Sequence, residues 1–139
     1  MLLQKAIIFR SKRLPKNHVF TCEHPLTEFF LEFTIRDEKF LINAVHLQAK
    51  SSKGLVFFLH GTLNHIQYHL PKAAVFLQNN LDVVIMDYPT YGKSKGKLTE
   101  DLLHEVVEIT FNKTIEKLNH TKDVYLVGRS LGTALASNL

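Results

Sequence analysis

Residues 124–136 have the residue types and the spacing of a serine nucleophile. An apolar run ends at Gly128, a run of good helix formers begins after Gly132, and Ser130 stands between them. The pattern G-x-S-x-G between a strand and a helix is typical of a nucleophile elbow, a strained turn that lifts the serine hydroxyl clear of the sheet. Side chains at positions 128 and 132 would collide with neighbouring backbone there. The N–H group of Leu131, at a helix N-terminus, could then stabilise an oxyanion.

Two further segments with polar residues follow apolar strands. Residues 55–59 are apolar on both faces, which indicates a buried strand, and they end at His60 and Gly61. Residues 82–86 repeat this pattern and lead into the loop 87–94. Because functional loops gather at the C-terminal ends of parallel strands, we expect both loops to lie near Ser130.

The elements around these loops alternate between strand and helix. Residues 28–35 and 40–47, joined by a polar turn at 36–39, predict an antiparallel hairpin. A strand at 124–127 precedes the serine turn, and small residues (Gly132, Ala134 and Ala136) should let the following helix lie close to the sheet. This order predicts an α/β fold whose sheet is parallel after the opening hairpin, with flanking helices.

Two helices are predicted between the strands. The first should carry Pro71 in its first turn, run to about residue 78 and close at Asn79 or Asn80 in the left-handed conformation. The second should begin with Thr99 as its N-cap and continue to about residue 119, with one apolar stripe.

Composition bounds the classes of function. The 139 residues suffice for one compact domain, and 45% hydrophobic with 22% charged residues is ordinary for a globular protein. The net charge of +4 gathers at residues 5–16 and 93–97, where no aromatic platform is interleaved, so we expect solvated faces and no nucleic-acid partner. A single cysteine, Cys22, excludes an internal disulfide framework. No apolar run approaches the length of about 20 residues that a membrane span needs, and residues 1–3 are too short for a signal sequence.

The sequence gives weaker support for two other functions, phosphate binding and zinc binding. A phosphate-binding loop of the form G-x-x-x-x-G-K-[ST] would need glycine at position 87, where the sequence has Asp87. His65 and His69 have the i, i+4 spacing of a zinc helix, but Ile66 replaces the expected glutamate, so we expect surface or loop histidines and no metal. No cofactor is predicted.

The three loops together resemble the serine-aminopeptidase-like branch of the α/β-hydrolases. That branch carries His-Gly after one strand (His60 and Gly61), D-Y-x-x-Y-G-x-S after the next (residues 87–94) and G-x-S-x-G after a third (residues 128–132). The resemblance implies a partial α/β-hydrolase domain over residues 28–139, preceded by an N-terminal extension over residues 1–27.

The resemblance also implies roles. Ser130 would attack the carbonyl of an ester, thioester or small peptide, forming an acyl-enzyme that water then releases. The N–H groups of Leu131 and Thr62 would form the oxyanion hole. His60 would support this loop and would not be the catalytic base, while the Asp87 segment would shape the side of the pocket. The structural loop residues implied are His60, Gly61, Asp87, Gly92, Gly128 and Gly132, and the partner implied is a small-molecule acyl substrate.

One departure from the family is large. Its catalytic triad runs Ser, acid, His along the chain, but no Asp, Glu or His occurs in residues 131–139, and all eight histidines precede Ser130. We therefore expect a fragment whose last strand has a bare apolar edge and which is inactive as a hydrolase by itself. The alternatives are that Ser130 is an ordinary turn serine or that the chain is a non-catalytic acyl-ligand-binding module or pseudoenzyme. The expected location is the cytoplasm, or a membrane surface if an N-terminal anchor is missing from this chain.

Overall fold

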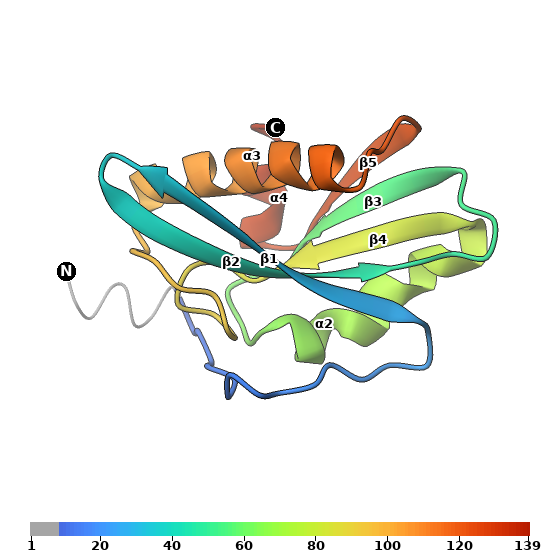
Figure 1. Cartoon of the computed structure of the whole chain (residues 1–139), viewed down its shortest axis with the longest axis horizontal. Helices are drawn as coiled ribbons and strands as arrows, with labels where there is room; N and C mark the ends of the chain where they lie inside the picture. Colours follow the sequence, from blue (N-terminus) through green and yellow to red (C-terminus); the bar gives the residue numbers. More distant parts are fainter. Residues whose placement is uncertain (1–8) are drawn as a thin grey trace.

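The computed structural model describes residues 9–139, and the predictions for residues 1–3 fall outside them. Five strands form one mixed sheet in the order β1-β2-β4-β3-β5 (Figure 1). The elements in chain order are β1 (Leu26–Ile35), β2 (Glu38–Leu47), β3 (Gly54–Leu59), α2 (Ile66–Ala73), the 3₁₀ helix η1 (Ala74–Asn79), β4 (Leu81–Met86), α3 (Glu100–Lys117), β5 (Asp123–Gly128) and α4 (Leu131–Ala136).

The opening hairpin has a tighter turn than predicted. β1 and β2 pair from Leu26 opposite Leu47 to Ile35 opposite Glu38, which leaves only Arg36 and Asp37 in the turn. Both turn residues have positive φ, 48° and 65°. Two left-handed residues match the twist of the flanking strands, so the strands pair right up to the turn and the predicted four-residue turn is wrong.

The rest of the sheet confirms the predicted α/β class. β4 pairs in parallel with β3, and β3 pairs in parallel with β5, whereas β2 joins β4 antiparallel. Helices α3 and α4 lie on one face of the sheet and α2 lies on the other (Figure 1). Because β3 and most of β4 are buried between two helical layers, their side chains alternate between two separate cores.

Each core joins one helical layer to one face of the central strands. On the first face, Phe57 and Leu59 of β3 pack with Val106 of α3 and Leu135 of α4. On the second face, alternate residues of β3 and β4 pack with α2, as Phe58 and Leu70 do.

Helix α2 begins earlier than the position of its proline suggested. The N–H of Ile66 donates to Oδ1 of Asp87 at 3.0 Å, so a distant carboxylate caps the helix. Pro71 therefore lies inside the helix, where its ring removes one backbone hydrogen bond, and the chain tightens into η1 after Ala73. The predicted left-handed closure is confirmed at Asn80, with φ 56° and ψ 37°.

Helix α3 has the N-cap and the buried apolar stripe that the sequence predicted. Oγ1 of Thr99 accepts a hydrogen bond from the N–H of Leu102 at 3.3 Å, which confirms the predicted N-cap. The helix buries the apolar stripe that includes Leu103, Val106 and Val107.

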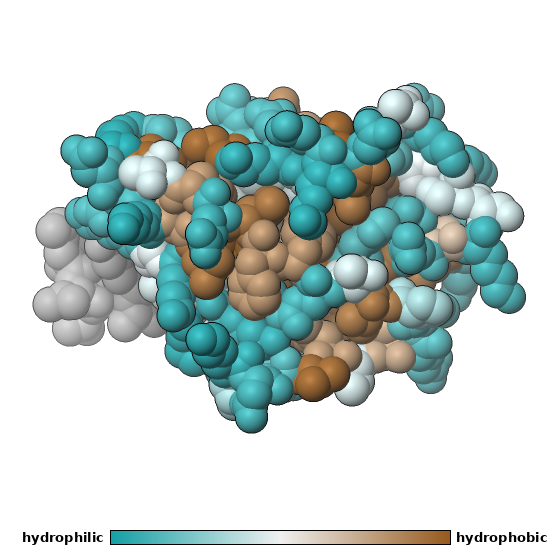
Figure 2. Space-filling model, in the orientation of Figure 1, coloured by the Kyte–Doolittle hydropathy of each residue, from teal (hydrophilic) through white to brown (hydrophobic). Residues whose placement is uncertain are grey.

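Strand β5 forms an open edge, as expected. Within the described residues it pairs only with β3, and the side chains of Tyr125 and Leu126 are 49% and 37% exposed. Apolar side chains also gather along the hairpin on the face shown in Figure 2. None of the helices formed by residues 9–139 is both long and apolar enough to span a membrane.

The segment before β1 packs against the body of the fold. Phe20 is 4% exposed and belongs to the core beneath α2. Nζ of Lys93 donates to the carbonyl of His18 at 2.5 Å and to Oε1 of Glu28 at 2.6 Å. These contacts tie the segment to the loop after β4; the domain boundary at residue 28 stays a prediction.

Candidate functional site

Ser130 occupies a strained turn between β5 and α4. Its backbone has φ 54° and ψ −118°, a conformation that is costly for a residue with a side chain and is characteristic of functional sites. The turn is fixed by the N–H of Arg129, which donates to the carbonyl of Leu59 at 3.0 Å. The residue itself is exposed. The turn therefore presents the serine beside the C-terminal end of β3.

Two glycines make this turn sterically feasible. A Cβ atom on Gly128 would lie 2.2 Å from the carbonyl oxygen of Gly132, and one on Gly132 would lie 1.9 Å from the carbonyl oxygen of Leu59. The predicted need for glycine at both positions is confirmed. Ala136 packs against the core, but Ala134 is exposed, so the prediction is wrong for Ala134.

The loop after β3 lies against the serine. A Cβ atom on Gly61 would lie 3.4 Å from Cβ and 4.0 Å from Oγ of Ser130. The carbonyl of Thr62, the next residue, accepts a hydrogen bond from the Tyr91 hydroxyl at 2.8 Å. Among residues 9–139, neither the N–H of Thr62 nor that of Leu131 donates to another residue. Two donors are thus left unused on the two loops that meet at Ser130.

A buried histidine–aspartate pair holds the loop after β3. Nε2 of His60 lies 3.0 Å from Oδ1 of Asp87, and Nδ1 lies 2.7 Å from the carbonyl oxygen of Gly61. Both side chains are fully buried. The Tyr88 hydroxyl donates to the carbonyl of His60 at 2.5 Å. Since both ring nitrogens already have partners, His60 is not placed to act on Ser130.

The loop 87–94 is closed by its own last residue. Oγ of Ser94 donates to the carbonyl of Asp87 at 2.7 Å and accepts from the N–H of Asn43 at 2.9 Å. Gly92 has φ 52°, and a Cβ atom there would lie 2.1 Å from Oδ2 of Asp87. Ser94 is fully buried, so this segment has the structure of a packed turn and not of a phosphate-binding loop.

His69 is the residue that sequence reasoning misplaced. It is 3% exposed and not a surface histidine, with its ring stacked on His60 at a centroid separation of 4.8 Å. Burial, followed by the neighbouring His60, lowers its pKa from 6.5 to about 4, and Nε2 of the neutral ring donates to the carbonyl of Leu63 at 2.7 Å. Burial also lowers the pKa of His65. The i, i+4 spacing was the only available signal, and it does not distinguish a buried face from an exposed one.

The two tyrosines of the network act as hydrogen-bond donors. Burial raises the pKa of Tyr88 well above its usual value, and burial with the nearby Asp87 raises that of Tyr91. Each hydroxyl therefore stays protonated.

Within the described part of the chain, no side chain hydrogen-bonds the Ser130 hydroxyl. The same residues contain no cluster of three or more His, Cys, Asp or Glu side chains suited to a metal ion.

Solved structures of similar shape identify the fold. An esterase of Pyrococcus furiosus superposes with a TM-score of 0.68 and 18% identity, over 93% of this chain and 49% of that chain. A probable hydrolytic enzyme of Pseudomonas aeruginosa superposes with a TM-score of 0.66 and 17% identity, over 91% and 39% respectively. The chain therefore has an α/β-hydrolase fold.

The family is shown by sequence. The model of the family described as serine aminopeptidase, S33, matches residues 50–139, and the chain belongs to this α/β-hydrolase family. A curated relative, the uncharacterized protein R595 of Acanthamoeba polyphaga mimivirus, is 26% identical over 108 residues, covering 73% of this chain and 36% of the relative. The chain thus spans less than half of the length of these relatives.

Proposed function

We propose that this chain carries the nucleophile and the oxyanion hole of a serine hydrolase that cleaves carboxylic esters, thioesters or small peptides. The observation that carries the proposal is the backbone of Ser130, held at φ 54° and ψ −118° beside Gly61. Strain of this kind is maintained only where surrounding packing imposes it, and here it exposes a hydroxyl next to two unused N–H donors. Membership of a hydrolase family supports the same reading.

The proposed reaction is acyl transfer to Ser130. Oγ attacks the carbonyl carbon while its proton passes to a general base, and the carbonyl oxygen becomes an anion. The N–H groups of Leu131 and Thr62 stabilise that anion. The leaving group departs with a proton, an acyl-serine remains, and a water molecule releases the carboxylic acid and restores the hydroxyl.

The described residues offer no general base for the first step. His60 is committed to Gly61 and Asp87 through both ring nitrogens. His69 lies behind it, bound to the carbonyl of Leu63. We infer that residues 9–139 are catalytically inactive by themselves, because loss of the triad partners lowers kcat by several orders of magnitude.

Chemical rescue tests the nucleophile. The 139-residue chain is incubated with a fluorophosphonate probe with and without added imidazole, which supplies a base from solution. We expect imidazole to accelerate labelling at Ser130, as located by peptide mass spectrometry. Ser130→Ala should abolish the label. Ser137, an exposed serine after α4, is the internal control and should stay unlabelled.

Two results would contradict the proposal. Equal labelling of Ser130 and Ser137 would show that the turn confers no reactivity. Efficient hydrolysis of p-nitrophenyl esters by this chain without imidazole would contradict the inferred inactivity. A folded chain that binds acyl ligands but is never labelled would favour the alternative, a non-catalytic acyl-binding module.

A further inference from the structure

Two basic segments that are distant in the sequence lie side by side in the fold. The N–H of Leu14 donates to the carbonyl of Gly92 at 3.0 Å, and the N–H of Gly92 donates to the carbonyl of Lys12 at 2.8 Å. The Arg13 guanidinium donates to the carbonyl of Ser94. The prediction of a solvated face is wrong for Lys93, which is buried, whereas the other cations of residues 10–16 and 93–97 are exposed. Together the two segments form one wall of a hollow.

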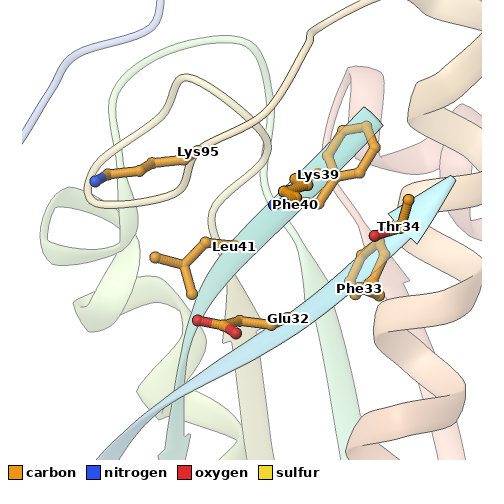
Figure 3. A pocket seen from close by; sticks show the side chains of 7 residues that line it. All are labelled: Glu32, Phe33, Thr34, Lys39, Phe40, Leu41 and Lys95. Carbon is orange, nitrogen blue, oxygen red and sulfur yellow. The ribbon is translucent and has the colours of Figure 1, made fainter. Parts of the chain in front are cut away.

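The floor of this hollow is apolar. It has a volume of about 430 Å³, and Leu14, Phe30 and Leu41 contribute its apolar surface. Phe30 is 43% exposed, although it lies on a strand of the sheet. The volume falls within the range of about 300–1,000 Å³ that is usual for small-molecule sites. A second hollow of about 470 Å³ continues from it along the hairpin and shares Glu32, Leu41 and Lys95 (Figure 3).

Two of the four cations around the floor, Lys16 and Lys95, have side chains with no hydrogen-bond or ion-pair partner among residues 9–139. Lys93 is paired with Glu28, but Arg13, Lys16 and Lys95 form no ion pair with any of residues 9–139. Among residues 9–139, Glu32 is the only carboxylate that lines either hollow. Figure 3 shows its carboxylate beside Leu41, with the Lys95 side chain on the far side of that leucine. The site therefore combines an apolar floor with an excess of positive charge at its rim.

We propose that this hollow binds a single-chain anionic amphiphile of the fatty-acid type. The alkyl tail lies on Leu14, Phe30 and Leu41, and the carboxylate pairs with Lys16 and Lys95. A free inorganic anion would leave the apolar floor unused. A single-stranded nucleic acid would need successive exposed aromatic platforms. Among residues 9–139, this hollow offers Phe30 alone, and in the adjoining hollow Phe40 is buried and Phe33 stacks on it. The proposal does not depend on Ser130.

Titration with sodium decanoate below its micellar concentration tests the site by calorimetry and amide NMR. We expect saturable binding with shifts centred on Phe30 and Leu41. Each methylene removed from the ligand should weaken binding by about fourfold. Decanol should bind at least about tenfold more weakly than decanoate, because it lacks the charge-assisted bonds. Decyltrimethylammonium should not bind.

Variants locate the ligand. The double substitution Lys16→Gln and Lys95→Gln should weaken decanoate binding by about tenfold. Lys97→Gln is the matched control, since Lys97 lies in the same loop but lines neither hollow, and it should leave binding unchanged. Shifts centred on Gly61 and Gly132 would instead place decanoate at the proposed hydrolase site, which separates this test from that of the hydrolase.

Four outcomes would overturn the proposal. Equal affinity for decanoate and decanol would mean that the cations play no part. Shifts centred on Tyr125 and Leu126 would place the ligand on the β5 edge. Equal binding of inorganic phosphate would reduce the site to an anion site. Binding to phosphatidylserine vesicles without binding of free decanoate would indicate a membrane surface instead.

Discussion

Nε2 of His60 lies 3.0 Å from Oδ1 of Asp87, and no solvent reaches either side chain. The same oxygen accepts the N–H of Ile66, so one carboxylate joins the ends of β3 and β4 to the start of α2. The other ring nitrogen faces the carbonyl of Gly61. Both ring nitrogens of His60 thus face an oxygen atom within hydrogen-bond distance. The pair therefore fixes the loop that carries Thr62.

Replacing Asp87 should destabilise the fold. Asp87→Asn keeps the size of the side chain but removes the charge that accompanies His60, and breaking a buried pair typically costs about 3–5 kcal/mol. Urea unfolding followed by circular dichroism measures the loss. Asp37→Asn, in the exposed hairpin turn, is the control and should change stability by less than about 0.5 kcal/mol. Equal stability of the two variants would show that the pair is dispensable.

Stability should fall in mild acid because of His69. Its pKa in the folded state is about 4, below the ordinary 6.5, so the unfolded chain binds more protons between these values. The free energy of unfolding should therefore be greatest above pH 6.5 and decrease toward pH 4, with His69 contributing at most about 1.4 kcal/mol per pH unit.

The variant His69→Gln tests whether His69 causes this pH dependence of stability. Glutamine keeps a donor for the carbonyl of Leu63 but does not titrate, so the slope between pH 6.5 and 4 should become shallower. His65, whose pKa is also lowered, leaves part of the slope in place. Unfolding curves at several pH values provide the measurement. An unchanged slope would assign the acid sensitivity to other groups.

Gly132→Ala should prevent normal packing of α4 on β3. The added methyl would lie 1.9 Å from the carbonyl oxygen of Leu59, which is rigid backbone of a central strand. We expect a loss of at least about 3 kcal/mol. Thermal unfolding compares this variant with Ala134→Ser, an exposed position on the same helix. A melting temperature equal to that of the control would mean that the helix can shift freely.

The open edge of β5 should promote self-association. Its strand has no proline and no internal charge, and its apolar side chains are exposed, whereas protected edges usually carry charges. Sedimentation velocity of this 139-residue chain should show concentration-dependent association that Tyr125→Lys reduces. Val75→Lys is the control, because Val75 is 50% exposed but lies on η1. If both variants associate like the parent chain, the edge is not the contact.

The sequence predicted the features that depend on short-range geometry. The alternation of residues 28–35 placed β1, and the apolar residues 55–59 placed β3, because side-chain periodicity follows directly from backbone geometry. The N-cap at Thr99 and the left-handed conformation of Asn80 were likewise predictable from the residue types at those positions. The roles of Ser130, Thr62 and Leu131 in catalysis stay predictions.

By itself the sequence determined that a serine stands between two glycines after an apolar strand, since steric exclusion at those positions is local. Only the tertiary structure decided where α2 begins, because Asp87 caps it from another loop. It also decided that His69 is buried against His60, and that Arg13 shares a hollow with Lys95. These contacts join residues far apart along the chain, and no local pattern encodes which distant partners packing will bring together.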